Sequence, residues 1–152
     1  MRDFRNLTVW QKGHVLALDI HRALQGVRAP GASAARIQLQ RSAASIPSNI
    51  AEGCGKRSDA EFARYIDIAF GSAKETENHR LFAVDMGWIT RDAYLLLDGR
   101  LTEVRRMLFA LSRVMRERVE MSRMSAENRA RRGDRAGEPA LSEGQGATRD
   151  EQ

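Results

Sequence analysis

The strongest hydrophobic pattern in the chain lies between residues 94 and 115. Apolar side chains recur there at alternating spacings of three and four: Tyr94, Leu97, Leu101, Val104, Leu108, Leu111 and Met115. This spacing puts them on one side of an α-helix, for which Thr90 is a suitable N-terminal cap. The pattern is that of a coiled coil or of one helix in a bundle.

A long helix is predicted before it, over residues 59–86. Ser58 and Glu61 have the spacing of a capping box, in which side chains satisfy backbone N–H groups of the first turn. Gly87 suits the left-handed position that ends many helices. The inner face of this helix is predicted to hold Phe62, Ile66, Ala69, Ala73 and Thr76.

The first third of the chain predicts two more amphipathic helices, over residues 8–26 and 33–53. Thr8 and Gln11 have the capping-box spacing at the start of the first. Pro47 lies inside the second and lacks the N–H that a helix needs there, so we expect a kink or a break. The predicted core residues of this second helix are Ile37, Leu39, Ala43, Ile46 and Ile50.

Four amphipathic helices with short connections favour an all-α fold, an antiparallel up-down-up-down four-helix bundle. We place this domain at residues 1–119. Beyond Met121 the periodicity stops and large apolar side chains are almost absent. Residues 120–152 are therefore predicted to be a disordered, charged tail, with some helical continuation at its start.

The bulky aromatic side chains predict an oligomer. A slim four-helix core accommodates few large rings, yet the chain carries Phe4, Trp10, Phe70, Phe82, Trp88 and Phe109. Some of these rings are expected to lie between protomers.

Cysteine usage and hydropathy bear on the compartment. Cys54 is the one cysteine, which excludes an intramolecular disulfide and favours a reducing cytoplasm. No stretch approaches the roughly 20 apolar residues of a membrane span, and the N-terminus lacks the apolar part of a secretory signal. We expect a cytoplasmic protein. Cys54 lies between two glycines. It is either a reactive thiol or an incidental residue of a turn.

The net charge of +5 is unevenly distributed along the chain. From Arg116 onward eight arginines face eight acids, whereas residues 1–115 hold 17 basic and 12 acidic side chains. A basic domain suggests an anionic partner, most commonly nucleic acid, although a solvated arginine-rich surface explains the same charge.

The candidate nucleic-acid-binding residues follow from the predicted topology. The N-terminus, the turn between the second and third helices and the end of the fourth helix would share one end of the bundle. Arg105 and Arg106 would add a basic pair on the outer face of the fourth helix. The full candidate set is Arg2, Arg5, Lys12, Lys56, Arg57, Arg64, Arg105, Arg106 and Arg113. Nearby acids dilute this set, and no aromatic stacking platform is expected, so sequence preference should be weak.

Enzyme chemistry finds no support in the sequence. None of His14, His21 and His79 follows a Glu at the Glu-x-x-His spacing of helical metal sites, or an Arg at the spacing of helical nucleases. The segment GCGKRS lacks the pattern of a phosphate-binding loop. We expect no catalytic site, no metal and no cofactor.

Three segments carry a family resemblance: RNLTVWQKG, QRSAASIPSNIAEGCGKRSDAEFARYIDIAFGSAKETE and MGWI. Over about residues 4–115 the chain resembles the four-helix bundle proteins encoded in intervening sequences of bacterial large-subunit rRNA genes, and the accessory proteins of diversity-generating retroelements. The resemblance implies a homopentamer around a central pore. In the retroelement members it also implies a basic surface that engages a reverse transcriptase and its template RNA.

Three functional interpretations remain open at this stage. The preferred one is a non-enzymatic, oligomeric adaptor or accessory protein that binds nucleic acid, RNA before DNA. The second is a structural or protein-binding helical oligomer whose charge only maintains solubility. The third is an unrecognised enzyme.

Overall fold

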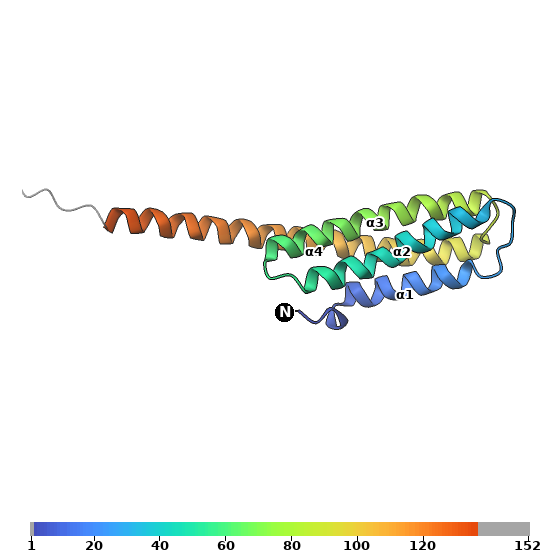
Figure 1. Cartoon of the computed structure of the whole chain (residues 1–152), viewed down its shortest axis with the longest axis horizontal. Helices are drawn as coiled ribbons and strands as arrows, with labels where there is room; N and C mark the ends of the chain where they lie inside the picture. The colour runs from blue at the N-terminus through green and yellow to red at the C-terminus, as the bar shows by residue number, and fades with distance from the viewer. Residues whose placement is uncertain (1, 137–152) are drawn as a thin grey trace, which may run out of the picture. The chain divides into compact units, whose positions relative to one another are not determined.

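The computed structural model describes residues 2–136, with side chains as far as Arg131. In chain order the elements are a 3-10 turn η1 (Phe4–Asn6) and the helices α1 (Thr8–Ala23), α2 (Ala32–Cys54), α3 (Asp59–Asp85) and α4 (Arg91–Ala136). Consecutive helices run in opposite directions through the bundle (Figure 1). The predicted all-α, up-down-up-down four-helix bundle is confirmed, and residues 2–136 contain no strand.

The chain divides into two compact units, Met1–Val119 and Glu120–Gln152. The four-helix bundle belongs to the first unit. In the second, residues 120–136 are helical, which extends the helical continuation predicted for the start of the tail. Good helix formers dominate it, and Arg123 Nε donates to Glu127 Oε1, one helical turn on, at 3.1 Å. The remainder of the predicted tail lies outside the described residues.

A chain that ends at Val119 should keep the melting temperature of the full chain. The reason is that the core lies within the first unit, and the described side chains from Glu120 to Arg131 are exposed. Thermal unfolding followed by circular dichroism checks this. A loss of more than about 4 °C, roughly 1 kcal/mol for a domain of this size, would show that the second unit stabilises the bundle.

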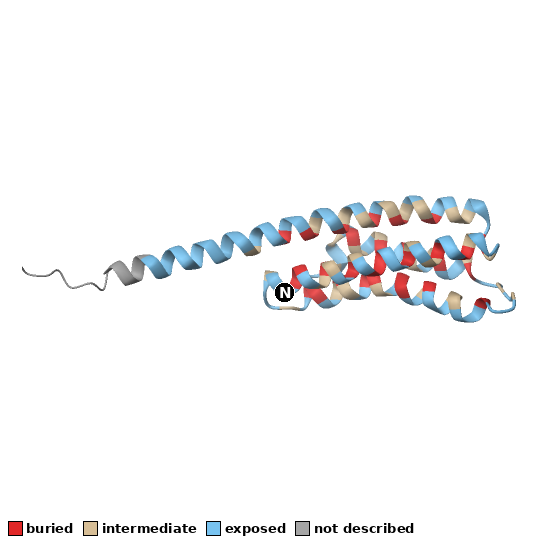
Figure 2. Cartoon of the chain, turned by 90° about the horizontal axis from the view of Figure 1, so that it is seen from above, coloured by how far each residue is buried: buried red, intermediate tan, exposed pale blue. Residues whose placement is uncertain are grey.

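The buried residues line the inward sides of the helices (Figure 2). The predicted inner face of α3 is buried throughout, and in α4 the periodic residues are buried or half-buried. The prediction for α2 holds at four of five positions. Ile37 is 56% exposed, because it lies two residues before the buried Leu39 and two residues is about half a helical turn.

The helix ends show which capping predictions were correct. Ser58 Oγ accepts from the Glu61 backbone N–H at 3.2 Å, and Thr90 Oγ1 accepts from Ala93 at 3.2 Å. Gly87 has a φ of 70°, and the backbone N–H of Trp88 reaches back to the Ala83 carbonyl at 2.9 Å. These contacts confirm the start of α3, the start of α4 and the end of α3.

The capping box predicted at Thr8 is wrong. Leu7 is the N-cap of α1 and makes no side-chain cap bond. Gln11 instead donates through Nε2 to the Arg5 carbonyl at 2.7 Å, because the η1 turn folds back over the start of the helix. Asp3 caps this η1 turn by accepting from the Arg5 N–H at 3.0 Å.

Helices α2 and α3 pack closely along small and hydroxylic residues. Ser45 and Ser72 hydroxyls lie 2.9 Å apart, and Thr76 Oγ1 donates to Ser42 Oγ at 3.1 Å. Pro47 lies inside α2, which nevertheless continues as one helix, so the predicted break is absent.

Among the described residues, no helix combines the length and the apolar character that crossing a membrane requires.

Candidate nucleic-acid interface

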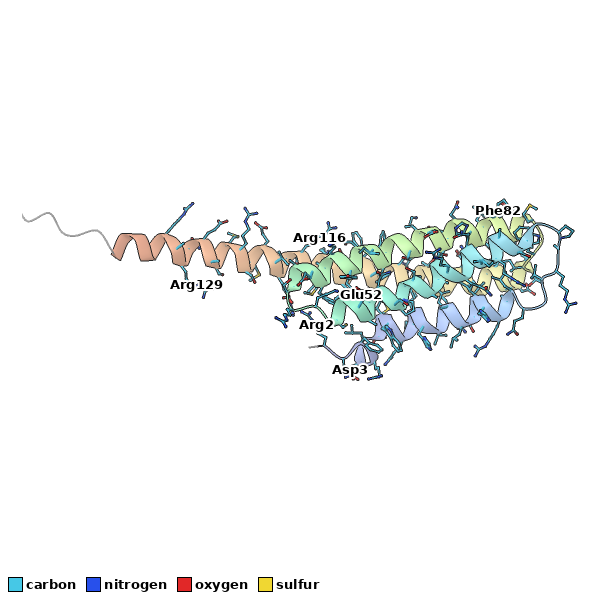
Figure 3. All side chains as sticks on the ribbon, in the orientation of Figure 1. Arg2, Asp3, Glu52, Phe82, Arg116 and Arg129 are labelled. Atoms are coloured by element: carbon cyan, nitrogen blue, oxygen red, sulfur yellow. The ribbon has the colours of Figure 1, made fainter. Side chains whose placement is uncertain are left out.

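One end of the bundle gathers three segments that are distant in sequence. Arg2, Glu52 near the end of α2, and Arg116 on α4 lie at this end, and Phe82 lies at the opposite one (Figure 3). Arg2 pairs with Asp59 at the start of α3, and Arg116 pairs with Asp67 at 2.8 Å. The predicted meeting of the N-terminus, the α2–α3 turn and α4 is therefore observed.

Most of the candidate cations at this end and beyond it are paired with acids. Among the nine candidates, six form ion pairs: Arg2 with Asp59, Arg5 with Asp3, Lys12 with Glu103, Lys56 with Glu52, Arg105 with Glu77, and Arg113 with Glu117. Pairing leaves less positive potential for phosphate groups than the sequence count suggests.

Three candidates differ from the others. Arg57, Arg64 and Arg106 are exposed and have no ion-pair partner within the described part of the chain. Arg57 belongs to the α2–α3 turn, Arg64 to α3 and Arg106 to α4. These three remain available to an external anion.

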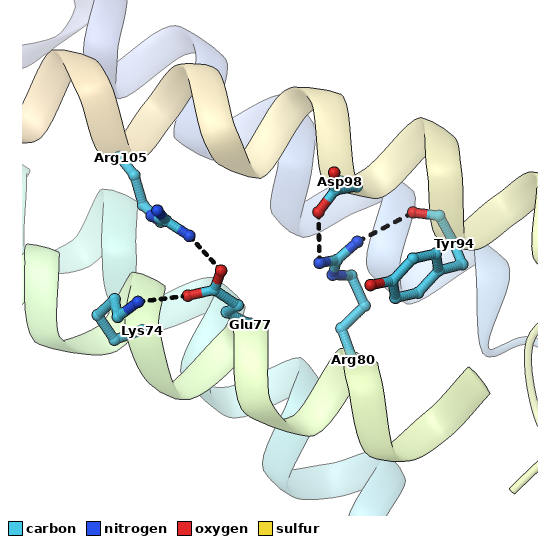
Figure 4. Close-up of polar contacts among 6 residues, drawn as sticks. All are labelled: Lys74, Glu77, Arg80, Tyr94, Asp98 and Arg105. Atoms are coloured by element: carbon cyan, nitrogen blue, oxygen red, sulfur yellow. Dashed lines mark hydrogen bonds and ion pairs between the residues drawn. The ribbon is translucent and has the colours of Figure 1, made fainter. Parts of the chain in front are cut away.

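The predictions for Arg105 and Lys12 need correction. Arg105 is not on the outer face of α4: it points toward α3 and pairs with Glu77, which Lys74 also contacts at 2.6 Å (Figure 4). Lys12 pairs with Glu103 at 2.8 Å on the α1–α4 side of the bundle. Lys12 and Arg105 reach these carboxylates because α4 packs between α1 and α3. No local sequence pattern shows which helices pack against one another.

Another ion pair between α3 and α4 contains a buried cation. Arg80 is 2% exposed; its Nη2 donates to Asp98 Oδ1 at 2.6 Å and its Nη1 to the Tyr94 carbonyl at 3.0 Å (Figure 4). Its guanidinium also lies 4.2 Å from the centre of the Tyr94 ring. Arg80 therefore joins the two helices and is not available to a ligand.

Two carboxylates that join α3 to α4, Asp67 and Glu77, have a pKa below the ordinary value. Burial raises the pKa of Asp67, but the Ser112 hydrogen bond at 2.6 Å and Arg116 outweigh it, so the pKa lies below its ordinary value. The Lys74 hydrogen bond, and then Arg105, lower the pKa of Glu77. Both groups favour the folded state when ionised.

We expect acid to weaken the bundle through these two carboxylates. A carboxyl whose pKa is lower in the folded state stabilises above its unfolded pKa, about 4, and this contribution is lost as the pH falls through the folded pKa. The free energy of unfolding should therefore fall below about pH 5. In the Asp67→Asn, Glu77→Gln double variant, urea unfolding from pH 6 to 3 should show a shallower fall. An equally steep fall would contradict the assigned pairs.

The net positive charge lies on the first helical hairpin. Residues 4–51, which form η1, α1 and nearly all of α2, hold six cations and one acid, Asp19: the cations are Arg5, Lys12, Arg22, Arg28, Arg36 and Arg41. Residues 52–115 hold ten of each sign. Arg28 and Arg41 are exposed and have no acidic partner among the described residues. Sequence reasoning missed this hairpin because it summed charge over the whole domain.

Most of the large rings are not fully buried: Phe82 and Phe109 are exposed, and the others except Phe62 are partly buried against the core. Phe62 is the one buried residue among the seven Phe and Trp side chains. The others form three pairs of neighbouring rings: Phe4 with Trp10, Phe70 with Phe109, and Phe82 with Trp88.

Phe70 and Phe109 line a surface pocket between α3 and α4. Phe109 is 63% exposed, and the two ring centres are 6.5 Å apart. The pocket has a volume of about 360 Å³, and its other lining residues are Asp67, Ser112, Arg113, Arg116 and Glu117. Its rim is balanced in charge, which suits a protein surface better than a phosphate backbone.

The described residues offer little to a metal or to thiol chemistry. They contain no cluster of three or more His, Cys, Asp and Glu side chains that could hold an ion. Cys54 is buried at the end of α2, and burial raises the pKa of its thiol, which opposes thiolate reactivity.

These features define a four-helix bundle protein with a basic hairpin and aromatic side chains on its surface. The chain belongs to the family described as 23S rRNA-intervening sequence protein, whose profile matches residues 5–110. This confirms the resemblance seen in the sequence.

One similar solved structure is a protein of unknown function from the S23 ribosomal protein family of Bacteroides thetaiotaomicron. The two chains are 26% identical with a TM-score of 0.64, over 69% of this chain and 98% of that one. No curated protein matches the chain significantly.

Proposed function

We propose that this protein is a non-enzymatic homopentamer that binds RNA as an adaptor or accessory factor for a protein such as a reverse transcriptase. The observation that carries the proposal is the concentration of positive charge on residues 4–51, with six cations against one acid. RNA affinity depends strongly on neutralised phosphates, and repetition of a modest patch around an oligomer adds avidity.

The phosphate contacts are assigned mainly to the α1–α2 hairpin. Arg28 and Arg41 lack acidic partners within residues 2–136. Arg36 donates one hydrogen bond, from Nη1 to the Val27 carbonyl at 3.4 Å. Arg57 and Arg64 supply a second set of contacts at the bundle end. That second set lies in the part of the domain where acids balance the cations.

Oligomer formation is assigned to the Phe70–Phe109 pocket. A phenylalanine with almost two thirds of its surface in water is costly in a monomer, and burying it against a second copy removes that cost. The balanced rim charges of the pocket match an identical chain without net repulsion.

Two matched charge reversals test the RNA assignment. Arg28→Glu with Arg41→Glu, and Arg57→Glu with Arg64→Glu, change the net charge equally. Binding of a labelled single-stranded RNA is followed by fluorescence anisotropy between about 50 and 200 mM salt, where each phosphate contact contributes about −0.7 to the slope of log affinity against log salt. The hairpin pair should weaken binding more and flatten the slope by about 1.4.

The alternatives give different results in the same titrations. A larger loss from the Arg57 and Arg64 reversal would place the interface at the bundle end. No binding by the wild-type protein even at low salt would overturn the RNA proposal. The structural oligomer would then replace it, an interpretation favoured by the six ion pairs that occupy candidate cations.

The genomic context separates the possible biological roles. A neighbouring reverse transcriptase gene with template and variable repeats would support the retroelement role. An rRNA gene that encloses this reading frame would support the intervening-sequence role.

A further inference from the structure

A short aromatic stack lies on the surface at the start of α1. The rings of Trp10 and His14 are parallel within 7° and their centres are 5.1 Å apart. The Phe4 ring also contacts Trp10, with ring centres 4.8 Å apart and planes tilted by 57°. The guanidinium of Arg5 lies 5.0 Å from the Phe4 ring centre. Four flat groups from the eleven residues between Phe4 and His14 therefore form one connected cluster.

The outer member of the stack is accessible. His14 is exposed, whereas Trp10 and Phe4 are half-buried and pack against the core. The core fixes Trp10, and Trp10 in turn supports the His14 ring. A flat ring held in this way is the feature on which unpaired bases stack in single-strand-binding proteins.

The charge around the stack complements a nucleic-acid strand. It belongs to the hairpin of six cations and one acid, and Asp19, that one acid, is occupied by Arg22 and Arg100. On the N-terminal side of His14 lies Arg5 of η1, which also pairs with Asp3 at 3.7 Å. On the C-terminal side lies His21, whose Nδ1 contacts Gln40, the neighbour of the exposed Arg41, at 3.1 Å.

We propose that the Phe4–Trp10–His14 stack binds an unpaired nucleobase of a single-stranded RNA, with the base lying on the exposed face of His14. This inference rests on the proposed RNA-binding function and adds base contact to phosphate contact. It replaces the expectation that the surface offers no stacking platform. The sequence signal was the spacing of four between Trp10 and His14, which places both rings on one face of α1.

Abasic RNA separates base stacking from phosphate binding. The protein is titrated with a short single-stranded RNA and with an abasic strand of the same length and charge. The wild-type protein should bind the base-containing strand about 5- to 100-fold more tightly, the range that stacking of one base on an aromatic ring supplies.

Two histidine variants complete the test. His14→Ala should remove most of this preference and leave affinity for the abasic strand and its salt slope unchanged. His21→Ala is the matched control, because it removes a histidine two turns further along α1 that no aromatic ring stacks on, and it should keep the preference. Circular dichroism of both variants verifies the fold.

Each outcome bears on one of the two proposals. Equal binding of both strands by the wild-type protein, or an unchanged preference in His14→Ala, overturns the stacking site and leaves the RNA-binding proposal standing. Failure of the wild-type protein to bind either strand at low salt overturns both.

Discussion

Replacing Phe109 with aspartate is expected to convert the proposed oligomer into monomers of 17.1 kDa. Phe109 is the most exposed aromatic side chain of the bundle and lines the pocket between α3 and α4. At the centre of an interface, loss of such an anchor costs about 2 kcal/mol or more per contact, at least tenfold in affinity, and a buried carboxylate adds its own desolvation cost. Light scattering at micromolar concentration measures the change.

The control for this variant is Ile37→Asp. Ile37 is a comparably exposed apolar residue, 56% against 63%, but it lies on α2, outside the proposed contact. It should leave the oligomer intact. If Phe109→Asp keeps the wild-type mass, the pocket is not the contact between protomers.

Replacing Gly53 with alanine is expected to destabilise the bundle by about 1–3 kcal/mol, the usual cost of an overpacked site. A Cβ at this position would lie 2.8 Å from Tyr65 Cβ and 3.1 Å from Phe62 Cδ2. The Tyr65 Cβ is attached directly to the α3 backbone, so it cannot move aside without shifting that helix. Denaturant unfolding measures the loss.

Gly71 provides the matched control within α3. No atom lies within 4 Å of a Cβ built there, so alanine meets no obstacle. Because alanine is the better helix former, Gly71→Ala should stabilise the protein by up to about 1 kcal/mol. If both substitutions change the free energy of unfolding equally, close packing against α3 is not the reason that position 53 requires glycine.

The fold was predictable because its signals are local. The regular spacing of apolar residues in α4 and the Ser58 and Thr90 caps depend on a few neighbouring residues, and the structure confirms them. Gly53 shows the limit of this approach. The sequence placed it at a helix end, but its close approach to α3 depends on how two helices pack.

The surface was less predictable because charge pairing depends on the packing of distant segments. The sequence placed Arg105 beside Arg106 on an outer face, whereas the helix register turns Arg105 toward Glu77 and leaves Arg106 exposed. The positive charge of the α1–α2 hairpin could have been found by summing charge over each pair of helices. The orientation of the His14 ring over Trp10 required the structure.

The central claim is that this chain acts on RNA as an oligomer. Native mass spectrometry of the protein mixed with a short single-stranded RNA tests both parts at once. The expected result is a complex with the mass of five 17.1 kDa chains plus bound RNA, and loss of the RNA as ionic strength rises. A single chain of 17.1 kDa at micromolar concentration, without RNA, would contradict the account.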